Sequence, residues 1–133
     1  MKKIFLLMKS VFHIVNIIFI ALYVYPGSIL GFLLYDNIQK QPNLTPNFMA
    51  LSSNHIYGFI FLSLLGLLSY YKNRSKQLFI YLFLASIFLE LSHNLIPQRN
   101  FQYQDLFGNL FGVFIIFIIF YLCKYLNKIY HEK

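Results

Sequence analysis

The sequence predicts an all-α integral membrane protein, a single-domain four-helix transmembrane bundle whose N- and C-termini lie in the cytoplasm. Three observations predict it. Of the 133 residues, 59% are hydrophobic and only 11% are charged, whereas a soluble domain carries about 25% charged residues. The hydrophobic residues form four long runs, and a helix that crosses a bilayer needs roughly 20 mainly apolar residues. The basic residues flank these runs mostly on one side, as they do in membrane proteins.

The first two predicted spans are residues 10–25 and 56–71. The first, SVFHIVNIIFIALYVY, stops at Pro26 and Gly27, which break helices. Lys9 interrupts the apolar run on its N-terminal side, and no Ala-x-Ala site follows it. We therefore expect a retained helix and not a cleaved signal peptide. The second run, IYGFIFLSLLGLLSYY, is short for a span.

The third and fourth predicted spans are residues 77–95 and 105–126. The third, QLFIYLFLASIFLELSHNL, is ended by Pro97, and the fourth reads DLFGNLFGVFIIFIIFYLCKYL. The link IPQRNFQYQ between them is short, so the two spans are expected to form an antiparallel hairpin of neighbouring helices.

The segment between the first two spans, residues 26–54, is predicted to be an outer loop. Its beginning, GSILGFLLYD, is apolar but too short to cross a bilayer. We expect this part to lie on the outer interface or to cover the bundle. The rest is polar and rich in turn-forming residues. The single cysteine, Cys123, excludes an intrachain disulfide.

The orientation follows from the 11 basic residues. With the N-terminus inside, two of them, Lys40 and Arg99, lie outside. The other nine lie inside: Lys2, Lys3, Lys9, Lys72, Arg74, Lys76, Lys124, Lys128 and Lys133. The positive-inside rule then places both termini in the cytoplasm. Topology and attraction to anionic membrane lipids account for the net charge of +7, so no nucleic-acid partner is expected.

Polar residues gather at one membrane level. The third span runs outward, which places Glu90 and His93 in its last two turns. The fourth begins outside, so Asp105 and Asn109 lie in its first two turns, and His55 lies at the outer end of the second. A carboxylate within a span is costly and usually faces the bundle interior with a partner. We expect these side chains to share one pocket near the outer boundary.

The helical spacing supports this arrangement. Asp105, Gly108, Asn109 and Gly112 fall on one face of the fourth span. Gly108 and Gly112 form a small-xxx-small pair, which predicts close packing within the chain or a homo- or hetero-oligomer contact. Arg99, in the link, is expected to reach Glu90 or Asp105.

A second polar pair lies in the first span. His13 and Asn16 are three residues apart and share a helix face. They are expected to form hydrogen bonds to neighbouring helices.

The polar residues of the third and fourth spans also resemble a known family, the VanZ-like membrane proteins, whose pattern runs E..Q...P.R.....D...N..G. The matching residues are Glu90, Pro97, Arg99, Asp105, Asn109 and Gly112. His55 resembles the histidine at the start of that family's second span. The resemblance covers roughly residues 54–122. Two positions differ: Leu51-Ser52 stands where the family has Asp-Lys, and His93 stands where it has Gln.

The resemblance implies a multi-pass protein of the cytoplasmic (inner) membrane of a bacterium, with an outward-facing polar site. The name-giving member is associated with low-level resistance to the glycopeptide teicoplanin, and others are linked to the cell envelope or surface polysaccharides. The implied function is the chemistry or binding of an anionic envelope lipid or glycolipid head group.

The candidate site residues fall into two groups. The catalytic candidates are Glu90 as acid or base, with Asp105 and His55. The ligand- and anion-binding candidates are Arg99, His93 and Asn109. As metal ligands, His55, Glu90, His93 and Asp105 would contain a single Glu-x-x-His copy, which does not make a bridged metal site, so neither a metal nor a cofactor is expected.

Two alternatives remain open. Glu90, Arg99 and Asp105 could form a buried ion-pair cluster that fixes helix packing. The protein would then be a non-catalytic interaction or structural subunit of an envelope complex. No nucleophile motif separates this from an enzyme. A transporter is not expected, because the polar groups stop at one face.

Overall fold

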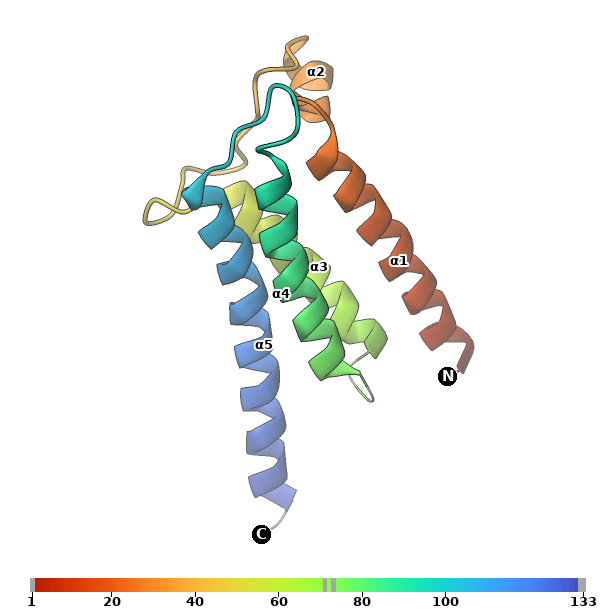
Figure 1. Ribbon diagram of the computed structural model, residues 1–133. Coiled ribbons are helices and arrows are strands. Elements are labelled where there is room, and N and C mark those ends of the chain that lie inside the picture. Colours follow the sequence, from red (N-terminus) through yellow and green to blue (C-terminus); the bar gives the residue numbers. More distant parts are fainter. Residues whose placement is uncertain (1, 71, 73, 132–133) are drawn as a thin grey trace.

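The computed structural model describes residues 2–70, 72 and 74–131. This part of the chain is helical and contains no strand beyond an isolated bridge between Phe48 and Leu51. Five helices follow one another: α1 (Lys2–Val24), α2 (Ile29–Tyr35), α3 (Ser53–Tyr70), α4 (Ser75–Ser92) and α5 (Tyr103–His131) (Figure 1). The predicted all-α class is confirmed.

Three helices in the described residues are long and apolar enough to cross a membrane: Lys3–Val24, Ser75–Ser92 and Tyr103–His131. They correspond to the first, third and fourth predicted spans. The second predicted span falls on α3, which is 18 residues long, as α4 is. It is not among the helices that are apolar enough, because its first turn, Ser53-Asn54-His55, is polar and serines interrupt it further on. Tyr71, the predicted last residue of that span, lies outside the described residues.

Several helix ends differ from the prediction. Helix α1 starts at Lys2 instead of residue 10, because lysine is a good helix former and Lys9 extends over the ring of Tyr70, with its ammonium 5.3 Å from the ring centroid. Helix α5 continues to His131, past the predicted end at residue 126, because the polar residues there include no helix breaker.

Helix α4 ends at Ser92, three residues before the predicted end. The backbone N–H of His93 bonds the Glu90 carbonyl, three residues back, so the last turn tightens. The following link contains Pro97 and then Gln98, whose φ is +63°. At the start of α3, the Ser52 carbonyl accepts the N–H of Ile56, which places the helix start ahead of the predicted residue 56.

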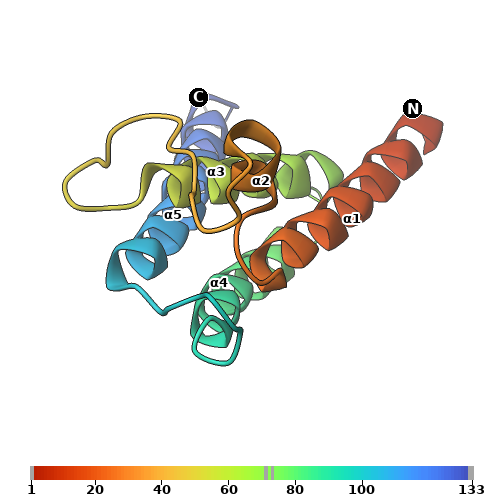
Figure 2. The same cartoon turned by 90° about the horizontal axis from the view of Figure 1, so that it is seen from above.

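Helix α3 lies at the centre and packs against α1, α4 and α5, while α4 packs against α5 (Figures 1 and 2). The buried core lies between these helices and is formed by Phe12, Phe59, Leu62, Leu67, Leu78, Leu82, Val113 and Phe117. The opposite side of α1 exposes large aliphatic residues such as Leu6 and Ile17, which are 69% and 66% exposed. Such a face suits contact with lipid acyl chains.

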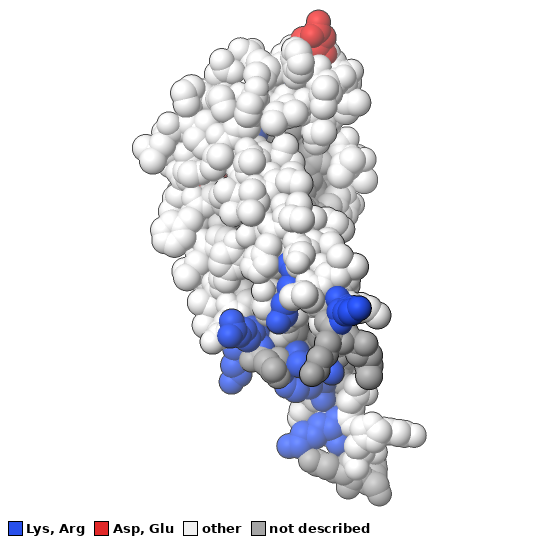
Figure 3. Space-filling model, turned by 90° about the vertical axis from the view of Figure 1, so that its right-hand side faces the viewer, with Lys and Arg blue, Asp and Glu red and all other residues white. Residues whose placement is uncertain are grey.

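The two ends of the molecule differ in charge. Both chain termini lie at one end, here named the terminal end, together with the link between α3 and α4 (Figure 1). Lys and Arg gather at this end of the space-filling view (Figure 3). The opposite, loop end carries the connections before and after α2 and between α4 and α5. The predicted separation of basic residues is therefore present in the fold.

Within the predicted outer loop, the apolar part forms α2. Ser28 caps it by accepting the N–H of Gly31 at 2.9 Å, and Asp36 ends it in the left-handed conformation with φ +51°. Seen from above, α2 lies over the bundle near α1 and α3 (Figure 2). Its residues Leu30 and Leu34 line a cavity beneath it. Of the two expected positions, α2 therefore takes the one that covers the bundle.

Candidate functional site

The loop end contains a cluster of six polar side chains contributed by four helices. This loop-end cluster consists of Tyr23 from α1, His55 from α3, Glu90 from α4, His93 just after it, and Asp105 and Asn109 from α5. Glu90 and Asn109 are fully buried, His93 and His55 are nearly so, and the side chain of Asp105 is 14% exposed. The predicted convergence of His55, Glu90 and Asp105 is present.

His55 is the centre of the cluster. Its Nε2 lies 3.3 Å from Oδ2 of Asp105. Its Nδ1 lies 2.9 Å from Oδ1 of Asn109, and 3.9 Å from Oε2 of Glu90. One imidazole ring therefore faces two carboxylates and one amide, which come from α4 and α5.

Hydrogen bonds fix which nitrogen of His55 carries the proton. The amide of Asn109 donates from Nδ2 to the Ser86 carbonyl at 3.3 Å, which turns its oxygen toward His55. The hydroxyl of Tyr23 donates to the same oxygen at 2.6 Å. An amide oxygen only accepts, so Nδ1 of His55 is the donor. Nε2 is then left to face Asp105.

The two oxygens of Glu90 differ. Oε1 accepts the backbone N–H of Gln102 at 3.1 Å and lies 3.3 Å from Nδ1 of His93. Oε2 is buried and has no hydrogen-bond partner among the described residues. A buried polar atom without a partner is costly and calls for a physical explanation.

His93 joins α4 to α1. Its Nε2 donates to the backbone carbonyl of Tyr23 at 3.1 Å, and its ring stacks on that of Tyr23, with centroids 5.6 Å apart. Both nitrogens thus face acceptors, the carbonyl and the Glu90 carboxylate. The arrangement fits the imidazolium form, which donates from both nitrogens.

Arg99 does not pair with either carboxylate, contrary to the expectation. Its Nε donates to the Tyr25 carbonyl at 3.2 Å and its Nη2 to the Leu22 carbonyl at 3.4 Å. These carbonyls lie at the C-terminal end of α1, where a helix leaves carbonyls without intrahelical partners. Burial lowers the pKa of the Arg99 guanidinium, while the negative charges of Glu90 and Asp105 oppose this shift. Arg99 therefore holds α1 against the α4–α5 link.

Two glycines bring α5 against α3. A Cβ atom on Gly108 would lie 2.9 Å from the Ser52 carbonyl oxygen, and one on Gly112 would lie 2.6 Å from that of Ile56. Close backbone contact at these positions sets Asp105 and Asn109 beside His55. Since α3 covers both glycines within the chain, an oligomer contact would need another face.

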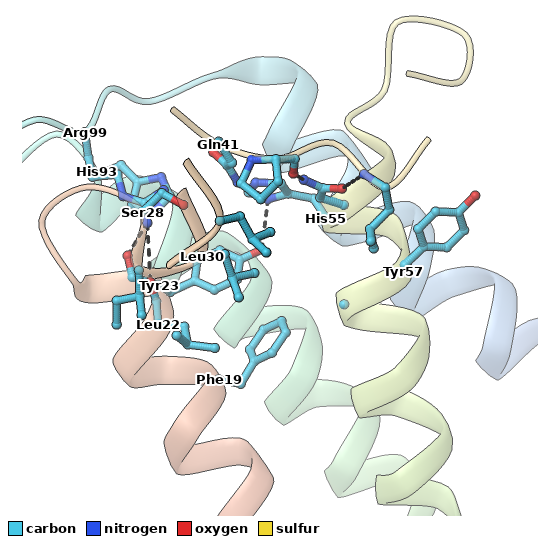
Figure 4. Close-up of a pocket in the computed structure, with 16 residues that line it drawn as sticks. Phe19, Leu22, Tyr23, Ser28, Leu30, Gln41, His55, Tyr57, His93 and Arg99 are labelled. Atoms are coloured by element: carbon cyan, nitrogen blue, oxygen red, sulfur yellow. Dashed lines mark hydrogen bonds between the residues drawn. The ribbon is translucent and has the colours of Figure 1, made fainter. Parts of the chain in front are cut away.

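A cavity of about 530 Å³ opens beside the cluster (Figure 4). His93 and Arg99 lie on one side of it and His55 on the other, with Tyr23 between them (Figure 4). The remaining wall is mostly apolar and includes Phe19, Leu22, Ile29, Leu30, Leu34, Pro42 and Leu44. The cavity therefore combines a long apolar wall with a polar, partly cationic end.

A second cavity of about 320 Å³ lies on the other side of Arg99. It is lined mainly by polar residues of the loops and of the α4–α5 link, including Asp105. The two cavities share the lining residues Ser28, Gln41, His93 and Arg99. Arg99 and His93 thus mark the boundary between an apolar and a polar compartment.

Tyr23 is the site residue that the sequence analysis missed. Its hydroxyl contacts both His55, at 2.8 Å, and Asn109. The sequence does contain a signal for it: His13, Asn16 and Tyr23 are spaced three and seven residues apart and form one polar stripe along α1. Such a stripe on an apolar helix indicates the face that packs on its neighbours.

Comparison of the chain with protein-family models, with curated proteins and with solved structures gives no match. The resemblance to the VanZ-like pattern therefore stays a prediction, and the function is argued from the site alone.

Proposed function

We propose that this chain is a VanZ-like four-span protein of the bacterial cytoplasmic membrane that binds an anionic envelope lipid at its loop end. In this proposal the terminal end faces the cytoplasm, and α3, the second predicted span, crosses the membrane together with α1, α4 and α5. The observation that carries it is the cavity of about 530 Å³, whose apolar wall leads to His55, His93 and Arg99. An apolar wall that ends at cationic side chains is complementary to a lipid whose acyl chain ends at an anionic head group.

Burial supports α3 as a span despite its polar residues. At 1.5 Å per residue, its 18 residues extend about 27 Å, close to the thickness of a bilayer core. His55, Ser63 and Ser69 are buried between the other helices. Polar groups turned toward the bundle interior avoid the cost of contact with lipid. A central helix can therefore cross a membrane with a lower hydropathy than its neighbours.

The cationic end of the cavity suits a phosphate or carboxylate. Arg99 uses Nε and one Nη2 hydrogen on carbonyls of α1, which orients the guanidinium and leaves its other donors for a ligand. His93 in its imidazolium form adds a second positive group on the same side of the cavity (Figure 4). Both residues belong to the anion-binding set that the sequence predicts.

Proton transfer at a bound head group would use His55 and Asp105. Nδ1 of His55 donates to Asn109, so proton exchange with a ligand would involve Nε2 and the Asp105 carboxylate 3.3 Å from it. Glu90 is fully buried and lines neither cavity that meets the cluster. His55 is therefore better placed than Glu90 to contact a ligand directly.

Native mass spectrometry of the gently solubilised protein tests the proposal. The wild type should carry a co-purified anionic lipid. Arg99→Gln should lose most of it, and Arg99→Lys should retain less than the wild type, because a single ammonium lacks the fork of the guanidinium. Arg74→Gln, the same change at the exposed terminal end, is the matched control and should keep the lipid.

A wild-type protein that carries no lipid, or equal retention in Arg99→Gln and Arg74→Gln, would overturn the proposal. The alternative, a non-catalytic subunit of an envelope complex in which the cluster only joins helices, would then be favoured.

A further inference from the structure

We propose that His55, Glu90 and Asp105 together bind one divalent transition-metal ion of the zinc class at the loop end. The sequence pattern led us to expect no metal, because Glu90 and His93 form a single Glu-x-x-His copy. The structure brings together three of the four residues considered for a metal, one each from α3, α4 and α5. The ion site does not depend on the lipid-binding proposal.

The ligand atoms have suitable spacing. One donor atom from each of the three residues lies within 4.8 Å of the others. His55 Nε2 and Asp105 Oδ2 are 3.3 Å apart. Two ligands about 2.1 Å from a tetrahedral zinc ion are separated by about 3.4 Å. This pair is thus already at the distance that a shared ion requires, and the Glu90 oxygen, which lies 3.9 Å from Nδ1, must shift toward the Nε2 side of the ring.

The unpartnered oxygen of Glu90 is an independent indication of a ligand. Glu90 is 0% exposed, and its Oε2 lies on the His55 side, 3.9 Å from Nδ1, with no hydrogen-bond partner among the described residues. Leaving a buried carboxylate oxygen without a partner is costly. A bound cation would satisfy it.

The surroundings hold each ligand as metal sites generally do. His55 donates its Nδ1 proton to Asn109, which leaves Nε2 with a lone pair when the ring is neutral. Glu90 Oε1 is held by the Gln102 N–H and by His93, which leaves Oε2 for the ion. These second contacts fix the tautomer of the histidine and the rotation of the carboxylate.

The imidazolium of His93 balances only one of the two carboxylates of the cluster. The ion pairs of Glu90 and Asp105 in the described residues involve only His55 and His93. Arg99, the nearest basic side chain of the α4–α5 link, donates to backbone carbonyls instead. A divalent ion would balance the two carboxylates. One imidazole nitrogen with two carboxylate oxygens suits Zn²⁺, Mn²⁺ or Fe²⁺ better than Ca²⁺, which takes six to eight oxygens.

Three protein ligands leave at least one coordination position open. His55 lines the apolar cavity and Asp105 lines the polar one, so the open position would face the space between them. There the ion could accept an oxygen of a phosphate or carboxylate ligand.

Isothermal titration with Zn²⁺ alone tests the site, on detergent-solubilised protein that has been stripped of ions with a chelator. A Cys123→Ser background removes the exposed thiol, which would bind zinc adventitiously. We expect one ion per chain. Glu90→Gln and Asp105→Asn should each weaken binding by more than about 100-fold, because losing a ligand exceeds the loss of a supporting contact. Asp36→Asn, the same charge change on an exposed carboxylate, is the control and should bind as the parent does.

X-ray absorption of the zinc-loaded parent protein gives a readout that does not depend on how the variants fold. It should show one imidazole with oxygen ligands and no sulfur. Absence of stoichiometric binding in the parent, a ligand set without imidazole, or unchanged affinity in both folded variants would each refute the site. None of these outcomes would affect the lipid measurement with Arg99→Gln.

Discussion

The two ends of the bundle fasten their helices in different ways. At the terminal end, His13 of α1 pairs with the Tyr70 hydroxyl of α3 at 2.7 Å, and Asn16 donates to the Tyr81 hydroxyl of α4 at 2.5 Å. These bonds confirm the cross-helix role predicted for His13 and Asn16. At the loop end, Tyr23 on the same face of α1 meets His55 and Asn109, but two carboxylates join them.

The two ends differ in whether they contain carboxylates and in whether each polar atom has a hydrogen-bond partner. The terminal-end pairs contain no carboxylate and have their partners, and no acidic residue lines the cavity of about 300 Å³ beside them. The loop-end cluster contains Glu90 and Asp105, and one oxygen of Glu90 has no hydrogen-bond partner within the part of the chain that the structure describes. Polar pairs without a carboxylate therefore join α1 to α3 and α4 at the terminal end. The carboxylates of the loop end need another explanation, and a bound ligand or ion provides one.

The largest expected effect concerns which end faces outward, because labelling is all-or-none. In a Cys123→Ser background, cysteines at Asn43 and Gln102, at the loop end, should react with an impermeant thiol reagent on intact cells. A cysteine at Asn127, on the exposed end of α5, should react only after permeabilisation. Labelling of Asn127 in intact cells would place the cluster on the cytoplasmic side.

Gly112→Ala should disturb the loop end next most strongly. The added Cβ would lie 2.6 Å from the Ile56 carbonyl oxygen and 2.9 Å from Phe59 Cβ, so α3 and α5 must separate. Overpacking of this kind costs about 1–3 kcal/mol, which thermal unfolding in detergent would measure. Gly58→Ala is the control: its Cβ meets only the ring edge of Phe19, which can rotate away. Equal losses in both variants would argue against a special α3–α5 contact.

Glu90→Gln separates ligand binding from structural fastening. In the presence of a chelator, the variant should be as stable as the wild type or more stable, by on the order of 1 kcal/mol, because the amide oxygen keeps the contacts of Oε1 and the amide nitrogen replaces the oxygen that has no partner among the described residues. Glu90→Ala should be less stable by about 1–3 kcal/mol, since it leaves the Gln102 N–H and His93 without their acceptor. If Glu90→Gln destabilises the protein as much as Glu90→Ala does, the charge of Glu90 itself stabilises the packing of the helices.

The smallest effect is expected at the terminal end. Tyr81→Phe removes the acceptor of Asn16, and such bonds between membrane helices are worth about 0.6 kcal/mol on average. The double variant with Asn16→Leu should recover most of this loss in thermal unfolding, and zinc and lipid binding should stay unchanged in both. A loss of lipid binding in Tyr81→Phe would mean that the two ends are coupled.

Much of the arrangement could be predicted from the sequence because it follows from one-dimensional rules. Apolar run length indicates the helices, and the basic residues divide the chain into two ends. With helices of known rise per residue, these rules place His55, Glu90 and Asp105 at one level. Glu90 and Asp105, which follow His55 by 35 and 50 residues, are therefore predicted to be its neighbours, and the structure brings them together.

Only the tertiary structure decided which partner each side chain takes. The membrane level of a residue and its spacing along the helix do not determine how a helix is rotated about its axis or how closely two helices approach. Gly108 and Gly112 let α5 approach α3 until Asn109 reaches His55 and fixes its tautomer. The unsatisfied carbonyls at the end of α1 attract Arg99, which the sequence had assigned to the carboxylates. Glu90 and Asp105 therefore face His55, at the place where we propose that a cation binds.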